Sequence, residues 1–173
     1  KSGFIYVVDA TTGKLISAEK TGKVTWAERI DLGTGRPVEA KNSRYEIGES
    51  VIWPWTGGTH NWMAMSYNPA TRLVYIPYMQ LGFRFTRAPD RFLGVVATPA
   101  HSDDPYDGRG ALIAWDPVTQ TQRWIVWHKW IWNGGTLSTA GGLVFQGAAN
   151  GWLTAYDAEN GQVLWRFDAG LGI

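Results

Sequence analysis

The sequence predicts an all-β protein made of repeated strands and tight turns. Two stretches are nearly the same phrase, Gly110–Asp116 (GALIAWD) and Gly151–Asp157 (GWLTAYD), and each is followed by a tryptophan eight residues after its aspartate. Gly3–Asp9 repeats the front half of this phrase, and a weaker copy begins at Tyr67. The copies recur about every 40 to 60 residues, a period typical of propeller blades. We therefore expect one partial β-propeller domain over residues 1–173, of roughly three to four four-stranded blades, with repeats near residues 3–17, 61–80, 110–124 and 151–165.

A tight turn is expected after each repeated strand. The pattern Asp-x-x-Thr/Asn-Gly begins at Asp9 and Asp157. In such a turn the aspartate side chain accepts hydrogen bonds from backbone N–H groups, and the glycine takes the left-handed conformation. The tryptophan that follows, Trp124 or Trp165, is expected on the next strand, where it can stack against a neighbouring blade. The first copy is degenerate, because Ser17 stands where its tryptophan is expected.

The remaining segments predict turns and connections, and none predicts a helix. Residues 31–38 (DLGTGRPV) are typical of a hairpin turn, whereas residues 14–25 and 84–100 are expected to be long irregular connections. The loop that contains Asp103, Asp104 and Asp107 lacks the alternating ligands and terminal Glu of an EF-hand. We therefore expect this loop to be solvated and to hold no calcium ion.

Composition excludes several classes of function. The 173 residues carry a formal net charge of +1, so nothing favours nucleic acid or an anionic membrane as a partner. No apolar run approaches the ~18 residues of a transmembrane helix. The absence of cysteine excludes disulfides, thiol chemistry and a CxxCH haem attachment within these residues. Eleven Trp and 21 Gly instead suit layered sheets with stacked rings and sharp turns.

Three segments give the chain a resemblance to a known family. They are Lys1–Gly13, Gly57–Pro69 and Trp132–Gly147. Propellers of many kinds share the Asp-x-x-Thr-Gly…Trp repeat, but the Asn-Trp…Met-Ser-Tyr-Asn-Pro and Trp-Asn-Gly-Gly-Thr motifs are more specific. With these motifs the chain resembles the C-terminal half of the propeller of pyrroloquinoline-quinone (PQQ)-dependent alcohol dehydrogenases, of the quinoprotein or quinohaemoprotein type.

The resemblance implies an eight-bladed propeller that holds PQQ near Ca²⁺ or a lanthanide ion. Such an enzyme oxidises alcohols in the periplasm by hydride transfer to the quinone, and passes electrons to cytochrome c or to a fused haem domain. An arc of three to four blades leaves open sheet edges and an unsealed channel. The resemblance therefore implies that residues 1–173 are a fragment, inactive alone.

Three residues match cofactor-contacting positions of the family. Lys1 matches the basic residue beside the quinone carbonyls, where a fixed cation stabilises the negative charge that builds on oxygen. Asn61 matches an amide on the quinone's polar rim, and an amide can both donate and accept hydrogen bonds. Asn133 matches a position that faces the cofactor plane, beside a glycine pair that allows close approach. Each residue has a simpler alternative. Lys1 could be a solvated lysine, Asn61 a turn residue that caps backbone before a strand, and Asn133 a loop residue beside turn glycines.

The resemblance also implies that the catalytic machinery is incomplete here. The catalytic aspartate and the cation's ligands come from earlier blades of the family's propeller, so no catalytic residue and no metal ligand is expected in residues 1–173. The recurring aspartates, such as Asp116, belong to turns. His60, His101 and His128 are far apart in sequence and match no metal-ligand spacing.

Two other functions remain open from the sequence. The first is a non-catalytic propeller scaffold that binds proteins or peptides, but it would not need the polar groups of Asn61 and Asn133 in the channel. The second is a small four-bladed propeller that binds a sugar or peptide on tryptophan platforms. The unequal repeat spacings and the missing tryptophan at Ser17 make a closed four-fold ring less favourable.

Overall fold

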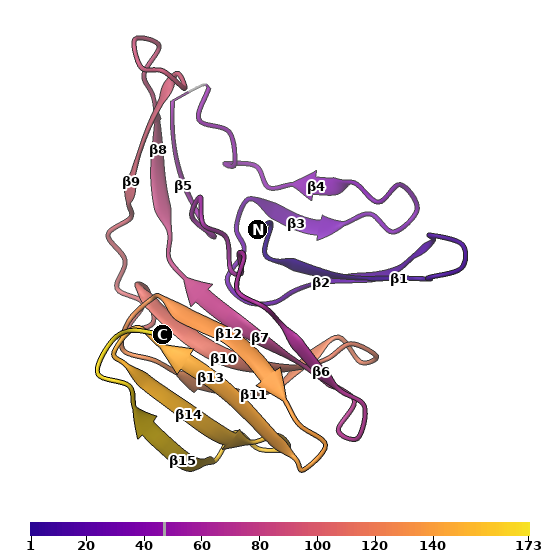
Figure 1. Cartoon of the computed structure of the whole chain (residues 1–173). Helices are drawn as coiled ribbons and strands as arrows, with labels where there is room; N and C mark the ends of the chain where they lie inside the picture. The colour runs from indigo at the N-terminus through magenta and orange to yellow at the C-terminus, as the bar shows by residue number, and fades with distance from the viewer. Residues whose placement is uncertain (47) are drawn as a thin grey trace. The chain divides into compact units, whose positions relative to one another are not determined.

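The computed structural model of the chain describes residues 1–46 and 48–173. The described residues form 15 strands and no helix, as the sequence predicts (Figure 1). No helix that is long and apolar enough to cross a membrane occurs among them. The chain divides into two compact units, the first made of Lys1–Thr59 and Gln80–Asp107 and the second of His60–Met79 and Gly108–Ile173.

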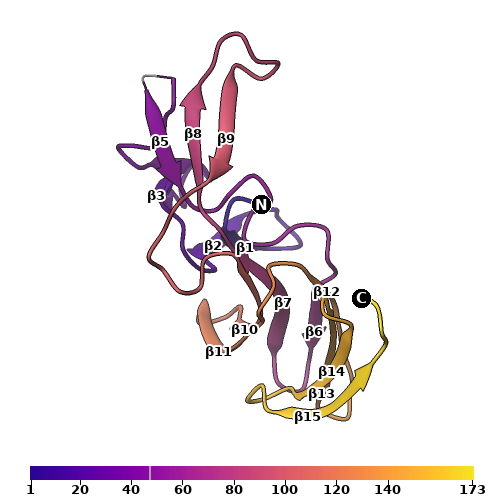
Figure 2. The same ribbon diagram turned by 90° about the vertical axis from the view of Figure 1, so that its left-hand side faces the viewer.

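The first unit contains two hairpins and one three-stranded sheet. Its strands are β1 (Phe4–Val8), β2 (Leu15–Lys20), β3 (Ala27–Ile30), β4 (Pro37–Glu39), β5 (Glu49–Ile52), β8 (Phe83–Arg87) and β9 (Val95–Pro99). Strand β1 pairs with β2 and β3 with β4, and the third sheet has the order β5-β8-β9 (Figure 2). The β3–β4 hairpin confirms the turn predicted at residues 31–38.

The expectation that residues 14–25 and 84–100 are irregular is wrong. Strand β2 lies in the first of these segments, and β8 and β9 occupy part of the second. In β9 most residues are exposed on both faces, so the strand has no alternation of buried and exposed side chains that a sequence pattern could reveal. Backbone pairing with β8, from Phe83 opposite Pro99 to Arg87 opposite Val95, defines it instead.

The second unit contains two four-stranded antiparallel sheets. Its strands are β6 (Ser66–Asn68), β7 (Leu73–Gln80), β10 (Arg109–Asp116), β11 (Thr121–Trp127), β12 (Asn133–Ser138), β13 (Leu143–Ala148), β14 (Trp152–Asp157) and β15 (Val163–Asp168). One sheet has the order β11-β10-β7-β6, and the other runs β12-β13-β14-β15 in chain order (Figure 1). The repeats near 61–80 and 110–124 therefore lie in one sheet.

The predicted turn chemistry recurs in both units. The Asp9 carboxylate accepts hydrogen bonds from the backbone N–H groups of Thr11 and Thr12 at 2.9 and 2.7 Å, and Gly13 has φ 72°. These hydrogen bonds lower the pKa of Asp9 from its ordinary value, the one from the Thr12 N–H contributing most. Asp157 caps its turn in the same way, with φ 77° at Gly161. The predicted role of these aspartates in turns is confirmed.

The core of the second unit lies between its two sheets. Leu73 and Tyr75 of β7 and Leu112 of β10 belong to the same buried cluster as Val144 of β13 and Tyr156 of β14. Burial of such side chains contributes ~1.5–3 kcal/mol each. The Tyr75 hydroxyl donates a hydrogen bond to the Ala158 carbonyl at 2.9 Å, which fixes the β7 sheet against the turn after β14.

Trp124 docks on the neighbouring sheet as predicted. Its Nε1–H donates to the Ala158 carbonyl at 3.1 Å, and its ring lies against Gly161, where an added Cβ would come within 2.7 Å of the indole. Trp165 occupies the matching place in β15 but is 49% exposed, and it contacts Phe145 and Phe167 of its own sheet. Within the described residues, the stacking between sheets is therefore confirmed for Trp124 and not for Trp165.

Candidate functional site

Lys1 immediately precedes the strand β1 in the first unit. The backbone beside it is fixed, because the Trp26 indole N–H donates to the Ser2 carbonyl at 2.8 Å. Gly3, with φ 87°, lies so close to Val24 that a Cβ would come within 2.4 Å of that side chain. Lys1 itself is exposed, and its ammonium group makes no ion pair among the described residues. The ammonium group of Lys1 thus follows an ordered backbone and is not neutralised by any described carboxylate.

Asn61 lies in the second unit, before β6, and is partly buried. The preceding residue is held in place, because the His60 ring is 2.8 Å from the Pro77 carbonyl through Nδ1. A carbonyl oxygen accepts hydrogen bonds, so Nδ1 is the protonated ring nitrogen. Burial lowers the pKa of His60, which favours the neutral ring.

The segments that contain Asn61 and Asn133 lie side by side. Trp62 and Trp132, their chain neighbours, stack with ring centroids 5.5 Å apart and an interplanar angle of 26°. Trp62 is 74% exposed, so it does not pack inside the second unit. Two of the three predicted cofactor residues therefore occur in one unit, whereas Lys1 belongs to the other.

Asn133 is buried at the start of β12, and its amide is engaged within the protein. Nδ2 donates to the Tyr78 carbonyl at 2.9 Å and to the Ile131 carbonyl at 3.3 Å. Oδ1 accepts a hydrogen bond from Gln146 Nε2 at 3.4 Å. Both amide hydrogens are thus used, which leaves one lone pair of Oδ1 for any further partner. The cofactor contact of Asn133 remains a prediction.

The glycines after Asn133 meet protein backbone. A Cβ on Gly135 would lie 3.0 Å from the Ala64 backbone nitrogen, and one on Gly134 would lie 3.2 Å from the Gly147 carbonyl oxygen. These contacts let β12 approach its neighbours closely, so they explain the glycine pair without a ligand. The Thr136 N–H donates to the Ala64 carbonyl at 2.8 Å and continues this contact.

A buried polar network that sequence reasoning missed joins Asn133 to His128. Gln146 is 2% exposed, and its Nε2 also donates to the Gly134 carbonyl at 3.1 Å. Its Oε1 lies 2.9 Å from His128 Nε2, which therefore donates. Burial of His128 lowers its pKa, and so does the charge of Arg166, while the Gln146 hydrogen bond opposes them. The only sequence signal was the place of Gln146 in the specific segment Trp132–Gly147.

The acidic loop of the first unit is not simply solvated. Asp104 forms an ion pair with Lys23 at 3.1 Å and accepts a hydrogen bond from Gln80 at 3.0 Å. Asp107 accepts the Trp53 indole N–H at 2.8 Å. The expectation of a solvated loop is therefore wrong for these two carboxylates, which attach the loop to the rest of the unit.

No metal centre is formed by the part of the chain that the structure describes. Among residues 1–46 and 48–173, no group of three or more His, Cys, Asp or Glu side chains lies close enough together to hold a metal ion. The side chains of His60 and His128 make the separate hydrogen bonds given above. The carboxylates of Asp104 and Asp107 interact with cations and N–H donors of the protein.

Known proteins resemble the chain over its whole length. It is 53% identical to quinohemoprotein alcohol dehydrogenase ADH IIB of Pseudomonas putida over 100% of this chain and 26% of that protein. A solved structure of quinohemoprotein alcohol dehydrogenase ADHIIG from P. putida HK5 matches 100% of the chain and 28% of its own, with TM-score 0.89 and 37% identity. A europium-containing methanol dehydrogenase matches 99% of the chain and 31% of its own, with TM-score 0.87 and 30% identity. No family model matches the chain.

The chain corresponds to one part of these longer proteins. It spans about a quarter of the length of the curated relatives it matches. The structural neighbours share its all-β architecture over 99% or more of its length, at 30% identity or higher. The resemblance inferred from the motifs is confirmed. From end to end, the chain is similar to a propeller segment of the quinoprotein and quinohaemoprotein alcohol dehydrogenases.

Proposed function

We propose that this chain is one propeller segment of a PQQ-dependent alcohol dehydrogenase. Residues 1–173 form part of a single propeller domain, and they supply contacts on the carbonyl side of the quinone. The catalytic aspartate and the metal ligands lie outside these residues. When bound, PQQ supplies the chemistry of hydride acceptance from the alcohol.

The observation that supports this proposal is that the chain is similar to the quinohemoprotein relative over its entire length. A scaffold that had lost the enzyme's function would be free to diverge at the channel, yet identity to the quinohemoprotein relative is 53% across the whole chain. The motifs around Asn61 and Asn133 are intact within it. This continuity favours the enzyme over a non-catalytic scaffold or a small ligand-binding propeller.

The described residues fit the carbonyl side of a quinone in different ways. Lys1 offers an exposed ammonium group without an ion pair among the described residues, which suits an oxygen that gains negative charge. Asn61 is partly buried beside the fixed ring of His60. Asn133 fits as a hydrogen-bond acceptor only, because its two amide hydrogens are directed to Tyr78 and Ile131.

The relatives' names extend the proposal to partners. We propose Ca²⁺ or a lanthanide as the metal, and the lanthanide is supported by a structural neighbour that is a europium-containing methanol dehydrogenase. Electrons would pass to cytochrome c or to a fused haem domain. The first route is supported by a relative named 1-butanol dehydrogenase (cytochrome c). An alcohol is the substrate, and the periplasm is the proposed location.

The test is cofactor-dependent alcohol oxidation by the complete protein that contains this chain. The apoprotein is mixed with PQQ and Ca²⁺ or a lanthanide, and turnover is followed with an artificial electron acceptor. Lys1→Ala should lower turnover by about two to three orders of magnitude, the scale expected for loss of one preorganised charge partner. Lys14→Ala, an exposed lysine in the β1–β2 turn, is the matched control and should leave turnover unchanged.

Two results would contradict different parts of the proposal. Wild-type turnover in Lys1→Ala would remove Lys1 from the cofactor site and leave the enzyme assignment intact. No alcohol oxidation by the complete protein with PQQ and any of these metals would reject the dehydrogenase function itself.

A further inference from the structure

A cavity of about 220 Å³ lies at one end of the β12–β15 sheet in the second unit. It is bounded by the connection between β11 and β12, the turn between β13 and β14, and the strand β15. It adjoins Trp132, the chain neighbour of Asn133, although Asn133 is not among the described residues that line it. The volume is below the roughly 300–1,000 Å³ of a drug-sized pocket, so only a small ligand fits.

The cavity lies on the side of this sheet that faces the other sheet of the unit. Arg166 pairs with Thr154, which is 4% exposed, and Trp152 lies two residues before Thr154. Because side chains alternate along a strand, both residues share the face of Tyr156, which packs in the core between the two sheets. Trp165, the chain neighbour of Arg166, points to the opposite face. The lining on β14 and β15 therefore belongs to the covered side of the sheet.

Several side chains of the cavity have N–H groups without a partner among the described residues. The Arg166 guanidinium forms no ion pair there and no hydrogen bond. The indole N–H groups of Trp130 and Trp152 likewise donate to none of the described acceptors. The side-chain oxygen of Asn150 accepts the backbone N–H of Trp152 at 3.3 Å, so the two amide hydrogens of Asn150 remain available.

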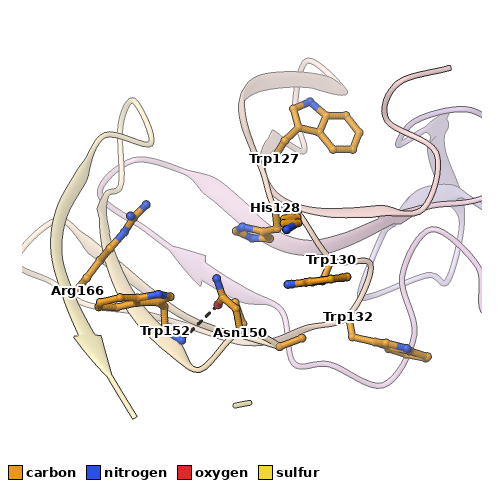
Figure 3. Close-up of a pocket in the computed structure, with 10 residues that line it drawn as sticks. Trp127, His128, Trp130, Trp132, Asn150, Trp152 and Arg166 are labelled. Carbon is orange, nitrogen blue, oxygen red and sulfur yellow. Dashed lines mark hydrogen bonds between the residues drawn. The ribbon is translucent and has the colours of Figure 1, made fainter. Parts of the chain in front are cut away.

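These donors surround the cavity. Figure 3 shows the indole nitrogens of Trp130 and Trp152 directed toward its middle from opposite sides. Asn150 and His128 lie between the two rings, and Arg166 lies at the edge. The charge of Arg166 also reaches His128, because it adds to the burial that lowers the pKa of that ring. Three separate segments of the chain thus bring N–H groups to one small space.

The charged groups that line the cavity are cations. Arg166 and Lys129 are positive, and none of the described lining residues is Asp or Glu. Lys129 Nζ lies 5.0 Å from the centroid of the Trp130 ring, so this cation is close to one of the donors. The cavity therefore disfavours a cation, and it offers few side-chain acceptors to the hydroxyls of a sugar. An oxyanion instead accepts several hydrogen bonds at once, and those from a guanidinium are charge-assisted.

We infer that this cavity binds a small inorganic oxyanion, phosphate, with Arg166 as its cation and the indole N–H groups of Trp130 and Trp152 as further donors. The oxygens of the anion accept the hydrogen bonds that no described residue accepts. A carboxylate of the proposed cofactor is a second source of the same chemistry, because the cavity adjoins Trp132. The inference does not depend on the proposed dehydrogenase function.

Calorimetric titration of the complete protein with phosphate, without added PQQ and at a constant chloride concentration, tests the inference. We expect saturable binding of one phosphate with a dissociation constant of about 1 mM or lower, typical of so small a ligand. The constant chloride keeps the general screening of surface charges the same throughout the titration. Absence of saturable binding below about 10 mM phosphate would overturn the inference.

Two substitutions locate the bound anion. Arg166→Gln should weaken phosphate binding about tenfold to hundredfold, the range for a lost charge-assisted pair. Trp152→Phe keeps an aromatic ring but removes the indole N–H, and it should weaken phosphate binding about threefold to tenfold because one hydrogen bond is lost. Arg123→Gln is the matched control, because Arg123 lies on β11 in an exposed ion pair with Asp116 and does not line the cavity. Wild-type affinity in either cavity variant, or an equal loss in Arg123→Gln, would contradict the inference.

A second titration with saturating PQQ present identifies the source of the anion. Phosphate affinity that PQQ leaves unchanged supports an inorganic anion as the occupant. Loss of phosphate binding when PQQ is present would assign these donors to a carboxylate of the cofactor and overturn the inorganic occupant. Failure of alcohol oxidation would not affect the titration without PQQ, so the two proposals can fail separately.

Discussion

His128 shows how one residue makes the stability of the fold depend on pH. Burial is the main cause that lowers its pKa in the folded chain, and the charge of Arg166 adds to it. The hydrogen bond that its Nε2–H donates to Gln146 opposes this lowering, but burial prevails, so the folded protein favours the neutral ring. The unfolded chain has an ordinary histidine pKa of about 6.5 and binds protons more readily. Stability from this residue is therefore complete above about pH 6.5 and is lost as the pH falls.

Replacement by an uncharged side chain tests this dependence. In His128→Gln, the free energy of unfolding should fall less between about pH 6.5 and 5 than in the wild type, since one titrating group is gone. Urea unfolding of the complete protein at several pH values measures it. The exposed His101 provides the control His101→Gln, which lacks the burial that perturbs His128. Equal pH slopes in His128→Gln and the wild type would show that this histidine does not contribute.

Single residues also explain which parts of the site were predictable. Motif position proposed Lys1, Asn61 and Asn133 as cofactor contacts, and these contacts remain predictions. The partners of Asn133 were not predictable, because Tyr78 and Gln146 are 55 and 13 residues away and only pairing of the strands brings them near. A glutamine that follows the apolar run Leu143–Phe145 gives no sign that it will be 2% exposed and hydrogen-bonded to both His128 and Gly134.

At the scale of elements, the glycines of the repeated turn have two separable roles. Gly13 and Gly161 both have positive φ, 72° and 77°. No atom lies within 4 Å of a Cβ added at Gly13, whereas one at Gly161 would come within 2.7 Å of the Trp124 ring. The first glycine therefore serves backbone conformation alone, and the second also receives the tryptophan of the neighbouring sheet.

Alanine at these two positions should separate the roles. Gly13→Ala should cost about 1–2 kcal/mol for the left-handed conformation of a residue with a side chain. Gly161→Ala carries this cost and about 1–3 kcal/mol more, because the added methyl group displaces Trp124. The difference in the free energy of urea unfolding measures the contact between the sheets. Equal losses in the two variants would mean that Trp124 moves away at no cost.

Elements were predicted well where the period of the repeat marked them. The strands β10 and β14 carry the repeated phrase, and each ends at its turn aspartate, Asp116 or Asp157. The edge strand β9 was missed because it buries almost no side chain. Similarly, Gln120 and Arg72 take positive φ without being glycine, at 56° and 58°, so the turns after β10 and β6 keep the geometry while losing the motif glycine.

At the scale of the whole molecule, sequence repeats and sheets do not correspond one to one. The phrases of β7 and β10 occur in a single sheet, while β12 to β15 form another with one full copy. A repeat marks a strand and its turn, and the long connection after β7 carries the chain through the β8–β9 hairpin before it returns to the same sheet. Sequence spacing could predict the fold class, but not which strands share a sheet.

One sheet of the second unit presents an uncovered apolar face. Cross-strand pairing aligns Leu137, Phe145, Ala155 and Trp165 in one row. Leu153 and Phe167 pair beside this row on the same side of the sheet. Leu137 is 63% and Phe167 54% exposed, so this face is more apolar than the surface of a stable monomer usually is. If residues 1–173 are part of a larger propeller, another blade covers the face as the β12–β15 sheet covers Trp124.

Trp165→Ala provides the decisive comparison. In the complete protein, this substitution should lower the free energy of unfolding by about 3–5 kcal/mol, the typical loss for a buried large aromatic side chain. Val118→Ala, at a turn residue that is 82% exposed, should change stability by less than about 0.5 kcal/mol. Among the described residues Trp165 is half-exposed, stacks on Phe167 and meets Phe145 edge to face, and these contacts cannot account for so large a loss. A large effect therefore requires a blade from outside these residues on this face, and an effect as small as that of Val118→Ala would mean that the face stays in water.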